Sequence, residues 1–232
     1  MDWHNSIAAN VQWTGLISNL EKKQRVTEKL AEQVGNGDVI GVGSGSTSFL
    51  AVQAISEKIK QQGIEITAIP TSKEVSQTCA ALGIPVTSLM NKRPDWAFDG
   101  ADEVDPDYNL IKGRGGAMFA EKLVMASADK SYILVDESKF VSRLGEKFPV
   151  PVEVDPRAVN LVEIRLYELG AANIKLRSAA GKDGPVITEA GNFILDVRFQ
   201  TIQESLEKEL SAIPGVIETG LFIHYPVEVI SL

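Results

Sequence analysis

The stretch DVIGVGSGSTSFLAVQAI, from Asp38 to Ile55, decides the fold. Its first residues form a short apolar run that stops at a glycine, which is typical of a buried strand. The residues that follow predict a helix, because apolar side chains recur at helical spacing along its inner face: Phe49, Leu50, Val52, Ile55 and Ile59. A strand that leads directly into a helix is the unit from which α/β proteins are built.

The same unit repeats along the next hundred residues. Gly63 closes the first helix, and Thr71 and Ser72 are N-cap candidates for a second helix that ends at Leu82. A third helix runs through Glu121 to Ala128. Four further strands are expected at ITAI (66–69), IPVTSL (84–89), WAF (96–98) and SYILV (131–135). The alternation predicts a mostly parallel sheet with helices on both faces, which binds ligands at the carboxyl ends of its strands.

The pattern changes after Lys147, where a smaller α+β unit is expected. Asp155 caps a helix that has Pro156 at its first position and ends before Gly170. A second helix is expected over TIQESLEKELSAI (201–213), and the expected antiparallel strands are VPVEV (150–154), NIKLR (173–177), PVIT (185–188) and FILDVRF (193–199), the last two joined by the turn EAGN. This order predicts a ferredoxin-like arrangement.

The apolar tail, GVIETGLFI and PVEVIS, indicates that the chain returns to the first domain, so that the small domain is an insertion. We therefore expect a first domain over 19–147 and 213–232 and an inserted domain over 148–212. Residues 1–18 show no clear periodicity, and we expect them to be a poorly ordered N-terminal extension.

Composition limits the function. The net charge of −8 over 232 residues disfavours binding to DNA or RNA, because the surface repels polyanions. No apolar run approaches the length of a membrane-spanning helix, and the start resembles no secretion signal. A single cysteine, Cys79, suits a reducing compartment, so we expect a cytoplasmic protein that binds neither nucleic acid nor membrane. Two isolated histidines, His4 and His224, leave few ligands for a metal, and we expect none.

The motif GSGST at 43–47 is a candidate phosphate site. It opens a helix, where Ser44, Gly45, Ser46 and Thr47 can direct backbone N–H groups and hydroxyls at an anion. The motif lacks the last glycine of the dinucleotide fingerprint and the Gly-Lys-Ser/Thr of a P-loop. The alternative is a tight turn whose serines only cap the helix.

Two neighbouring motifs, DGADEVD (99–105) and KGRGGAMFAEKL (112–123), carry acid and base chemistry. Asp99 and Asp102 can face one ligand just after a strand, and burial of such a pair raises the proton affinity of one of them. The alternative is a solvated acidic turn, which is our interpretation of Glu103 and Asp105.

The second of these motifs can stabilise a negative charge. Lys112 and the amides of Gly113, Arg114 and Gly115 can meet a developing oxyanion, although a merely flexible glycine loop is the alternative. Glu121 on the following helix is a candidate base or a simple partner of a nearby lysine. Lys139 can meet an anion or solvent. Cys79 lies on an apolar helix face and is interpreted as a core residue.

In this order and spacing, the motifs GSGST, DGADE, KGRGGA, the pair Glu121–Lys122 and DESK (136–139) resemble the ribose-5-phosphate isomerase family of the A type. The resemblance runs from about Lys23 to the C-terminus and includes IPGVIETGLF (213–222). It implies a Rossmann-like domain with an inserted ferredoxin-like domain, assembled as a homo-oligomer, a dimer or a tetramer.

The resemblance also implies roles for single residues. The sugar phosphate is expected at Ser44, Gly45, Ser46 and Thr47, with Lys23 as a helper. The sugar's hydroxyls and carbonyl are expected at Asp99, Gly100, Ala101 and Asp102 and at Lys112, Gly113, Arg114 and Gly115. Glu121 matches the family's catalytic base and Lys139 a substrate-binding lysine. Many members have threonine at Ser44 and glycine at Arg114, departures that remove no functional group.

The expected reaction interconverts D-ribose 5-phosphate and D-ribulose 5-phosphate through an enediolate, in the non-oxidative branch of the pentose phosphate pathway, without a cofactor. In it Lys112 and the loop amides stabilise the oxyanion, and Asp99 or Asp102 shuttles the hydroxyl proton. Two rivals are a sugar-phosphate sensor without catalysis and an aminosugar-phosphate deaminase. A deaminase is expected to open its ring with a histidine, and neither histidine lies in a motif.

Overall fold

The β-α pattern from Asp38 to Ile55 is confirmed in the computed structural model, which describes residues 13, 16–181 and 183–231. Strand β1 spans Val39–Val42 and helix α2 spans Ser46–Gln62. The helix ends at Gly63, which has a φ of 64° and donates its N–H to the carbonyl of Ile59. This left-handed conformation favours glycine, and the expected helix stop is therefore confirmed.

The second β-α unit also follows the sequence pattern. Strand β2 spans Thr67–Pro70 and helix α3 spans Lys73–Ala81. Of the two N-cap candidates, Ser72 is the cap, because its hydroxyl accepts a hydrogen bond from the N–H of Val75 at 3.2 Å. That bond satisfies one of the backbone donors that a helix leaves open at its start.

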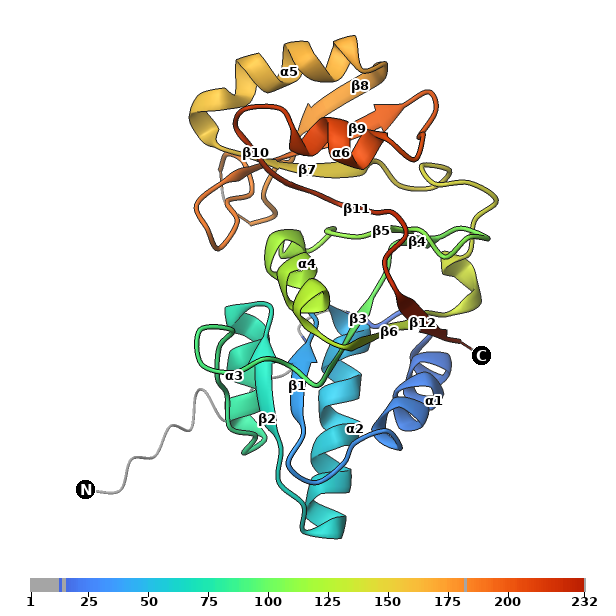
Figure 1. The fold of residues 1–232 in the computed structure, drawn as a ribbon, viewed down its shortest axis with the longest axis vertical. Coiled ribbons are helices and arrows are strands. Elements are labelled where there is room, and N and C mark those ends of the chain that lie inside the picture. The colour runs from blue at the N-terminus through green and yellow to red at the C-terminus, as the bar shows by residue number, and fades with distance from the viewer. Residues whose placement is uncertain (1–12, 14–15, 182, 232) are drawn as a thin grey trace, which may run out of the picture. The chain divides into compact units, whose positions relative to one another are not determined.

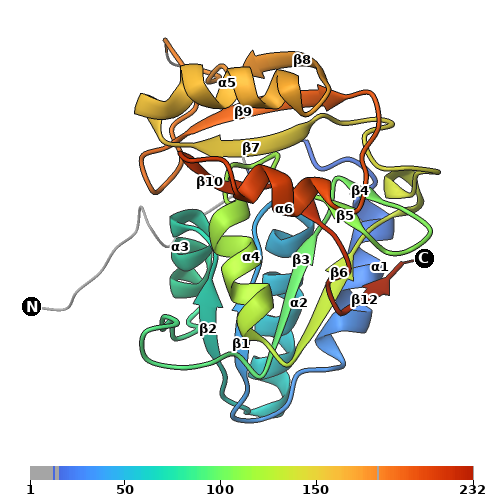
Figure 2. The ribbon, with the colours of Figure 1, turned by 45° about the horizontal axis from the view of Figure 1, so that its top comes forward.

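The strands of these units belong to a parallel sheet of five strands, in the order β12-β6-β3-β1-β2 (Figure 1). The other three strands are β3 (Trp96–Gly100), β6 (Lys130–Leu134) and β12 (Val227–Ile230). Every pairing in this sheet is parallel, and Figure 2 shows the strands side by side from a second direction. The segment PVEVIS contains β12, which pairs with β6, so the return of this part of the tail to the first sheet is confirmed. The other part, GVIETGLFI (215–223), does not join this sheet, because its strands Val216–Thr219 and Leu221–Phe222 pair with strands of two other sheets.

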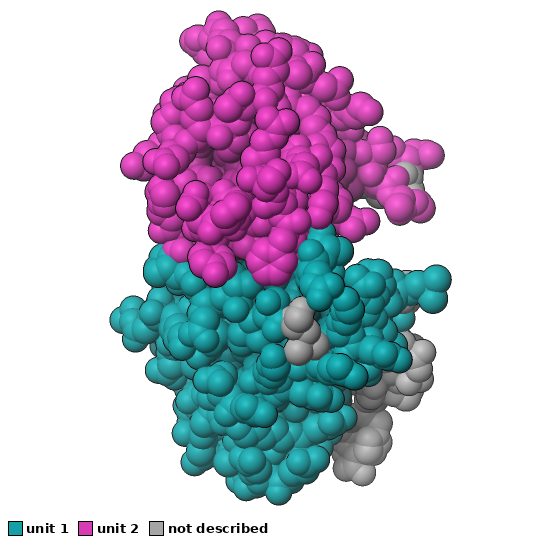
Figure 3. Space-filling model, turned by 90° about the vertical axis from the view of Figure 1, so that its right-hand side faces the viewer, with its two compact units in different colours: residues 1–100, 123–138, 226–232 teal, residues 101–122, 139–225 magenta. Residues whose placement is uncertain are grey.

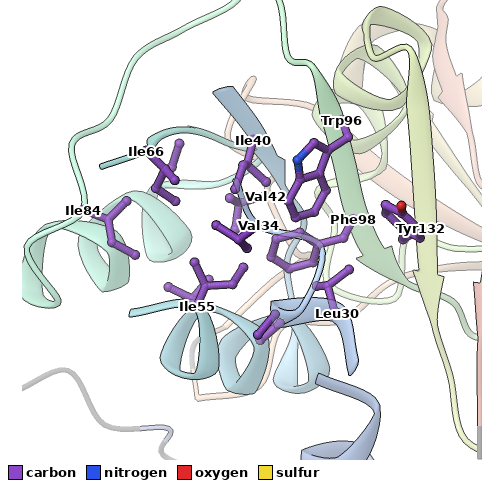
Figure 4. Close-up of a cluster of buried hydrophobic side chains, with 14 of the residues drawn as sticks. Leu30, Val34, Ile40, Val42, Ile55, Ile66, Ile84, Trp96, Phe98 and Tyr132 are labelled. Atoms are coloured by element: carbon purple, nitrogen blue, oxygen red, sulfur yellow. The ribbon is translucent and has the colours of Figure 1, made fainter. Parts of the chain in front are cut away.

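Helices cover both faces of the parallel sheet, as expected. On one face α1 (Leu20–Ala31), α2 and α3 enclose a core that contains Leu30, Ile40, Ile55 and Phe98 (Figure 4). On the other face lies α4 (Met118–Ser127), and a Cβ on Gly41 would lie only 2.4 Å from a methyl carbon of Val124. Glycine at this position therefore lets α4 approach the strand closely.

A second sheet has four antiparallel strands in the order β10-β7-β9-β8. Its core contains Val152, Val162, Leu195 and Leu210. The chain runs strand, helix, strand, strand, helix, strand, which confirms the ferredoxin-like prediction. Its elements are β7 (Val150–Val154), the short helix η3 (Pro156–Ala158), α5 (Val159–Glu168), β8 (Ala171–Leu176), β9 (Phe193–Phe199), α6 (Leu206–Ser211) and β10 (Val216–Thr219).

A small third sheet was not expected from the sequence. It pairs β4 (Glu103–Val104) with β5 (Leu110–Ile111), and β5 with β11 (Leu221–Phe222), all antiparallel. Each of these strands has two residues, too few for an alternating pattern to stand out. The acidic motif at 99–105, expected as a loop, therefore contains the end of β3 and the whole of β4.

Three expected elements differ from the structure. IPVTSL forms no strand, and its only ladder contact is a single bridge between Val86 and Ala68. PVIT likewise makes only the bridge between Pro185 and Ser178. In both segments a central apolar side chain is exposed, Val86 by 43% and Ile187 by 52%, so burial does not favour a full strand. The helix expected over 201–213 is confined to α6.

Contacts divide the described chain into two units, coloured separately in Figure 3. The first unit comprises residues 1–100, 123–138 and 226–232, and the second comprises 101–122 and 139–225. The domain boundaries predicted from the sequence stay a prediction. The expectation for the N-terminal extension falls mostly on residues 1–12 and 14–15, which lie outside the described ones. Within the described ranges, no helix is both long enough and apolar enough to cross a membrane.

Candidate active site

In the first unit, the glycine-rich motif forms the turn between β1 and α2. Gly45 has a φ of 89° and precedes the helix, and its carbonyl accepts the N–H of Phe49. The N–H groups that precede that of Phe49 at the start of the helix have no carbonyl partner within the helix, so an anion can accept their hydrogen bonds. Ser44, Ser46 and Thr47 are partly exposed beside them.

A lysine ammonium group lies at this turn. Lys23 of α1 is 6% exposed, and its Nζ donates to the Ser46 hydroxyl at 3.0 Å. The hydroxyl of Ser44 accepts a hydrogen bond from the Thr71 hydroxyl at 3.4 Å. A buried positive charge at the start of a helix is more than capping requires, and it favours the phosphate interpretation over the tight-turn alternative.

Asp99 lies next to the same turn, on the neighbouring strand. The sequence places it just after a strand, but it lies within β3, as does Gly100. The carboxyl is 2% exposed and accepts the N–H of Gly100 at 2.7 Å. A Cβ on Gly43 would lie 2.1 Å from the Asp99 carboxyl carbon, so glycine at 43 makes room for this carboxyl group.

In the second unit, Lys112 and Glu121 form a buried ion pair. Lys112 follows β5, Glu121 lies in the first turn of α4, and Lys112 Nζ is 3.1 Å from Glu121 Oε2. Their side chains are 3% and 6% exposed. This places a carboxylate, the natural base for a carbon-bound proton, beside an ammonium group that can neutralise a neighbouring oxyanion.

Asp102 lies among the same charged groups. Burial raises the pKa of Asp102 above its usual value, and the charge of Glu121 raises it further. The ammonium groups of Lys112 and Lys139 and the N–H of Arg114, which donates to Asp102 Oδ2 at 3.2 Å, lower this pKa and partly offset the burial. The structure thus brings Asp102, Lys112, Glu121, Lys139 and the glycine loop together.

The glycine loop 113–116 has a conformation that depends on its glycines. Gly113 has a φ of 98°, and a Cβ there would lie 2.9 Å from that of Met118. Gly116 also has a positive φ, of 83°. Arg114 and Gly115 are exposed at the tip of this loop.

Two residues, Lys122 and Arg177, support these groups in roles that the sequence alone does not predict. Lys122, the neighbour of Glu121, places its Nζ 2.7 Å from both Glu207 Oε1 and Glu218 Oε1. It also donates to the carbonyls of Thr219 and Leu221, so it ties the first turn of α4 to β10 and β11. Arg177 holds the carbonyls of the glycine loop. The loop carbonyls are 63 and 64 residues from Arg177, and the two glutamates are 85 and 96 residues from Lys122, so no local pattern indicates these contacts.

The acidic residues interpreted as a solvated turn differ from one another. Glu103 is fully buried and accepts the N–H groups of Gly145, Lys147 and Phe148, each at 2.6 Å, so the solvated interpretation is wrong for it. Asp105 accepts the N–H groups of Asp107 and Asn109, as a turn-capping aspartate does.

The remaining reactive side chains lie elsewhere. Cys79 is fully buried in the core of the first unit, and burial raises the pKa of its thiol to about 12, which confirms the core interpretation. His224 is 3.4 Å from Glu204, and His4 lies outside the described residues. Within residues 13, 16–181 and 183–231, no group of three or more His, Cys, Asp or Glu side chains is arranged to hold a metal ion.

The comparisons with known proteins agree with this chemistry. Residues 67–231 match the family model of ribose 5-phosphate isomerase A (phosphoriboisomerase A). The chain is 45% identical to a ribose-5-phosphate isomerase A of Methanothermobacter thermautotrophicus over 89% of its own length and 91% of the relative's. It is 44% identical to the one from Thermosynechococcus vestitus, over 88% of each chain.

Solved structures show the same relation. The ribose 5-phosphate isomerase A of Methanocaldococcus jannaschii matches with a TM-score of 0.88 and 41% identity, over 92% of this chain and 96% of that one. A D-ribose-5-phosphate isomerase in complex with phospho-erythronic acid matches with a TM-score of 0.88, 40% identity and the same coverage. On the match of fold, sequence and family model together, this chain belongs to the ribose 5-phosphate isomerase A family.

Proposed function

We propose that this protein interconverts D-ribose 5-phosphate and D-ribulose 5-phosphate, with Glu121 as the base. The observation that carries the proposal is the buried pair in which Lys112 Nζ lies 3.1 Å from Glu121 Oε2. A buried carboxylate beside a fixed ammonium group suits the removal of a carbon-bound proton and the stabilisation of the oxyanion that results.

The proposed reaction starts from the open-chain aldose. Glu121 takes the proton from C2, the C2–H electron pair forms the C1=C2 double bond, and the C1 carbonyl oxygen becomes the enediolate oxygen. Lys112 and the N–H groups of the glycine loop stabilise that oxygen. Glu121 then returns the proton to C1 while the C2 hydroxyl loses its proton and becomes the ketone. Asp99 or Asp102 carries the hydroxyl proton from O2 to O1 and assists ring opening.

The remaining residues bind the substrate in this proposal. Ser44, Gly45, Ser46, Thr47 and Lys23 hold the phosphate, and this binding orients the open-chain sugar for proton transfer. Gly100, Ala101, Gly113, Arg114, Gly115 and Lys139 contact the sugar. No metal or redox cofactor takes part, because fixed donors meet the negative charge of the intermediate.

The ligand of the solved relative supports this chemistry. Phospho-erythronic acid is the ligand named for that relative, which is 40% identical to this chain. A sugar acid of this kind ends in a carboxylate, whose two oxygens and planar carbon resemble the oxygen-bearing end of an enediolate. A site that stabilises an enediolate is expected to bind such an acid tightly.

The experiment is to incubate the purified protein with ribose 5-phosphate and to measure ketose formation, with and without a chelator. We expect ribulose 5-phosphate to form at the same rate in both samples. Binding without turnover would support a sugar-phosphate sensor instead. Release of ammonia from an aminosugar phosphate would support a deaminase, and a rate that falls with chelator would contradict the cofactor-free mechanism.

We also propose that the protein works in the cytoplasm as a homo-oligomer, a dimer or a tetramer. Helix α5 supports the oligomer, because it exposes Leu161, Ile164 and Tyr167 by 43%, 58% and 51%. Apolar groups exposed together on one element are typical of contact surfaces. Light scattering of the purified protein should give a multiple of the 25.1 kDa chain mass, and a monomer would contradict the proposal.

A further inference from the structure

Arg177 makes an unusual set of contacts in the second unit. It follows β8 directly, and its Nη1 donates to the carbonyl of Gly113 at 2.9 Å and to that of Arg114 at 2.8 Å. Its Nε donates to Asp196 Oδ2 at 2.9 Å, and its Nη2 contacts the other oxygen of the same carboxylate. One guanidinium group, held by a carboxylate of β9, therefore fixes two successive peptide units of the glycine loop.

The geometry of the peptide unit gives these contacts a consequence. Within the described residues every peptide bond is trans, so the C=O and N–H of each unit point in opposite directions. The carbonyl of Gly113 shares a unit with the N–H of Arg114, and the carbonyl of Arg114 shares one with the N–H of Gly115. Because Arg177 holds both carbonyls, both N–H groups point away from it. The N–H of Arg114 donates to Asp102 Oδ2 at 3.2 Å.

The loop has two other contacts: the Gly113 carbonyl also accepts the N–H of Gly116 at 3.1 Å, and the Arg114 guanidinium lies 5.9 Å from the centre of the Phe148 ring. Neither contact holds the Arg114 carbonyl. A Cβ on Gly115 would meet nothing within 4 Å, and Arg114 is exposed. Glycine backbones lose much conformational freedom when they are ordered, so an unsupported loop would sample many orientations. A planar guanidinium with several fixed donors can restrict two carbonyls at once, which a lysine ammonium does less well.

We propose that Arg177 is a positioning residue. By holding the carbonyls of Gly113 and Arg114, it aims the N–H of Arg114 at the Asp102 carboxylate and the N–H of Gly115 at the substrate oxyanion. The inference rests on the proposed function, in which Asp99 or Asp102 carries the hydroxyl proton and the loop stabilises the enediolate. Arg177 acts through the loop and does not contact the substrate. Its removal should therefore reduce turnover more than substrate binding.

The chain offers a matched control for this test. Arg198 on β9 also donates to two backbone carbonyls, those of Gly145 at 3.0 Å and Lys147 at 2.7 Å, in a loop that carries no proposed site residue. Arg177→Met and Arg198→Met each remove two bonds to backbone carbonyls, and both are compared in the full-length protein by the same ribose 5-phosphate assay.

We expect Arg177→Met to lower kcat by about 10- to 100-fold with a change in KM below about threefold, because the lost interaction forms in the transition state. Arg198→Met should keep kcat within about twofold of the wild type. Guanidinium ion at millimolar concentration should partly restore the activity of Arg177→Met, and ammonium should not. If Arg177→Met does not fold, Arg177→Lys, which keeps the charge beside Asp196, takes its place and should show the same loss to a smaller extent.

A second measurement reports on the conformation of the glycine loop and does not depend on turnover. The N–H of Arg114 lowers the pKa of Asp102, whereas Lys112, Lys139 and Glu121, which also act on this carboxyl, stay in place. Titration of the Asp102 carboxyl carbon by NMR should therefore give a higher pKa in Arg177→Met than in Arg198→Met. Equal kcat values in the two variants, or equal Asp102 pKa values, would overturn the inference. A wild-type protein that does not isomerise ribose 5-phosphate would overturn the proposed function, and the titration would still decide the role of Arg177.

Discussion

The two glycine-rich loops are built differently. The course of the first, at 43–47, is set by its neighbours in sequence, since β1 leads into it and α2 leaves from it. Its remote contacts through side chains, from Lys23 and Thr71, are with the hydroxyls of Ser46 and Ser44. The second, at 113–116, is held by distant residues. Arg177 holds its carbonyls, and the N–H of Lys112 just before it donates to the Gly220 carbonyl at 2.9 Å. A turn between a strand and a helix can be predicted from local pattern, whereas a loop held by remote side chains cannot.

The two loops are also expected to have different roles in the reaction. In our proposal the first loop binds the phosphate, which is present throughout the reaction, and the second meets a charge that exists only during it. Changes at the first loop should therefore act mainly on KM, and changes at the second mainly on kcat. Variants of lysines at each loop test this difference.

The largest of these effects is expected for Lys112→Met. It removes the ammonium beside Glu121, and we expect kcat to fall by about 100- to 1000-fold, as for the loss of one oxyanion donor in other enzymes. Lys130→Met is the control, because Lys130 forms an exposed ion pair with Glu228 and should leave kcat unchanged. Steady-state kinetics of both variants decide the matter, and a normal kcat in Lys112→Met would exclude Lys112 as the donor.

A smaller effect, on KM, is expected for Lys23→Met. Loss of the charge beside Ser46 should raise KM for ribose 5-phosphate by about 10-fold, in line with a charged hydrogen bond to phosphate, with little change in kcat. Lys22→Met on the same helix is the matched control, since Lys22 is exposed and pairs with Glu137. If Lys23→Met reduced kcat and left KM unchanged, the division between the two loops would be wrong.

Glycine variants compare the packing of the two loops. A Cβ on Gly43 would lie 2.1 Å from the Asp99 carboxyl carbon, and we expect Gly43→Ala to lower the free energy of unfolding by about 1–3 kcal/mol. Gly115→Ala meets nothing within 4 Å and should change it by less than about 0.5 kcal/mol. Urea denaturation of both variants measures the difference, and equal losses would refute the close packing at Gly43.

The smallest effect concerns the pH dependence of stability at Asp102. Burial raises the pKa of this carboxyl in the folded protein, so folding favours its protonated form. Its contribution to stability is therefore present below the unfolded pKa and is lost as the pH rises through the folded pKa. Asp102→Asn should be more stable than the wild type at about pH 8, and the advantage should vanish at about pH 4. Denaturant titrations of both proteins at the two pH values measure this difference in the free energy of unfolding. If Asp102→Asn were less stable than the wild type at the higher pH, the predicted direction of the effect would be contradicted.

Much of the fold was predictable because it depends on local periodicity. The strand-helix units around Val39 and Ile66, the cap at Ser72 and the ferredoxin-like order after Val150 all follow from spacing that the sequence displays. Strands β4 and β5 are not predicted because two residues show no period, and β11 is expected only as part of the apolar segment GVIETGLFI. The segments around Val86 and Ile187 have the apolar pattern of strands, but both side chains remain exposed. Burial depends on the tertiary structure, so the local pattern could not show that these strands do not form.

The residues of the candidate site also fall into two groups, those that local sequence indicates and those that it does not. The motifs containing Ser44–Thr47, Lys112 and Glu121 stand out because their residue types are unusual for a structural loop. The supporting residues do not, since Lys122 finds its two glutamates 85 and 96 positions away and Arg177 reaches back 64 positions to Gly113. Glu103 was misread because its three N–H donors come from 145–148, which only the folded chain brings to it.

The proposal depends above all on the role of the Glu121 carboxylate as the base. The most direct test is Glu121→Gln, with kcat measured on ribose 5-phosphate and the affinity for phospho-erythronic acid measured by calorimetry. We predict that kcat falls by about 1000-fold or more, as expected for loss of a general base, while the variant still binds the acid. A kcat close to that of the wild type would contradict the assignment of Glu121 as the base.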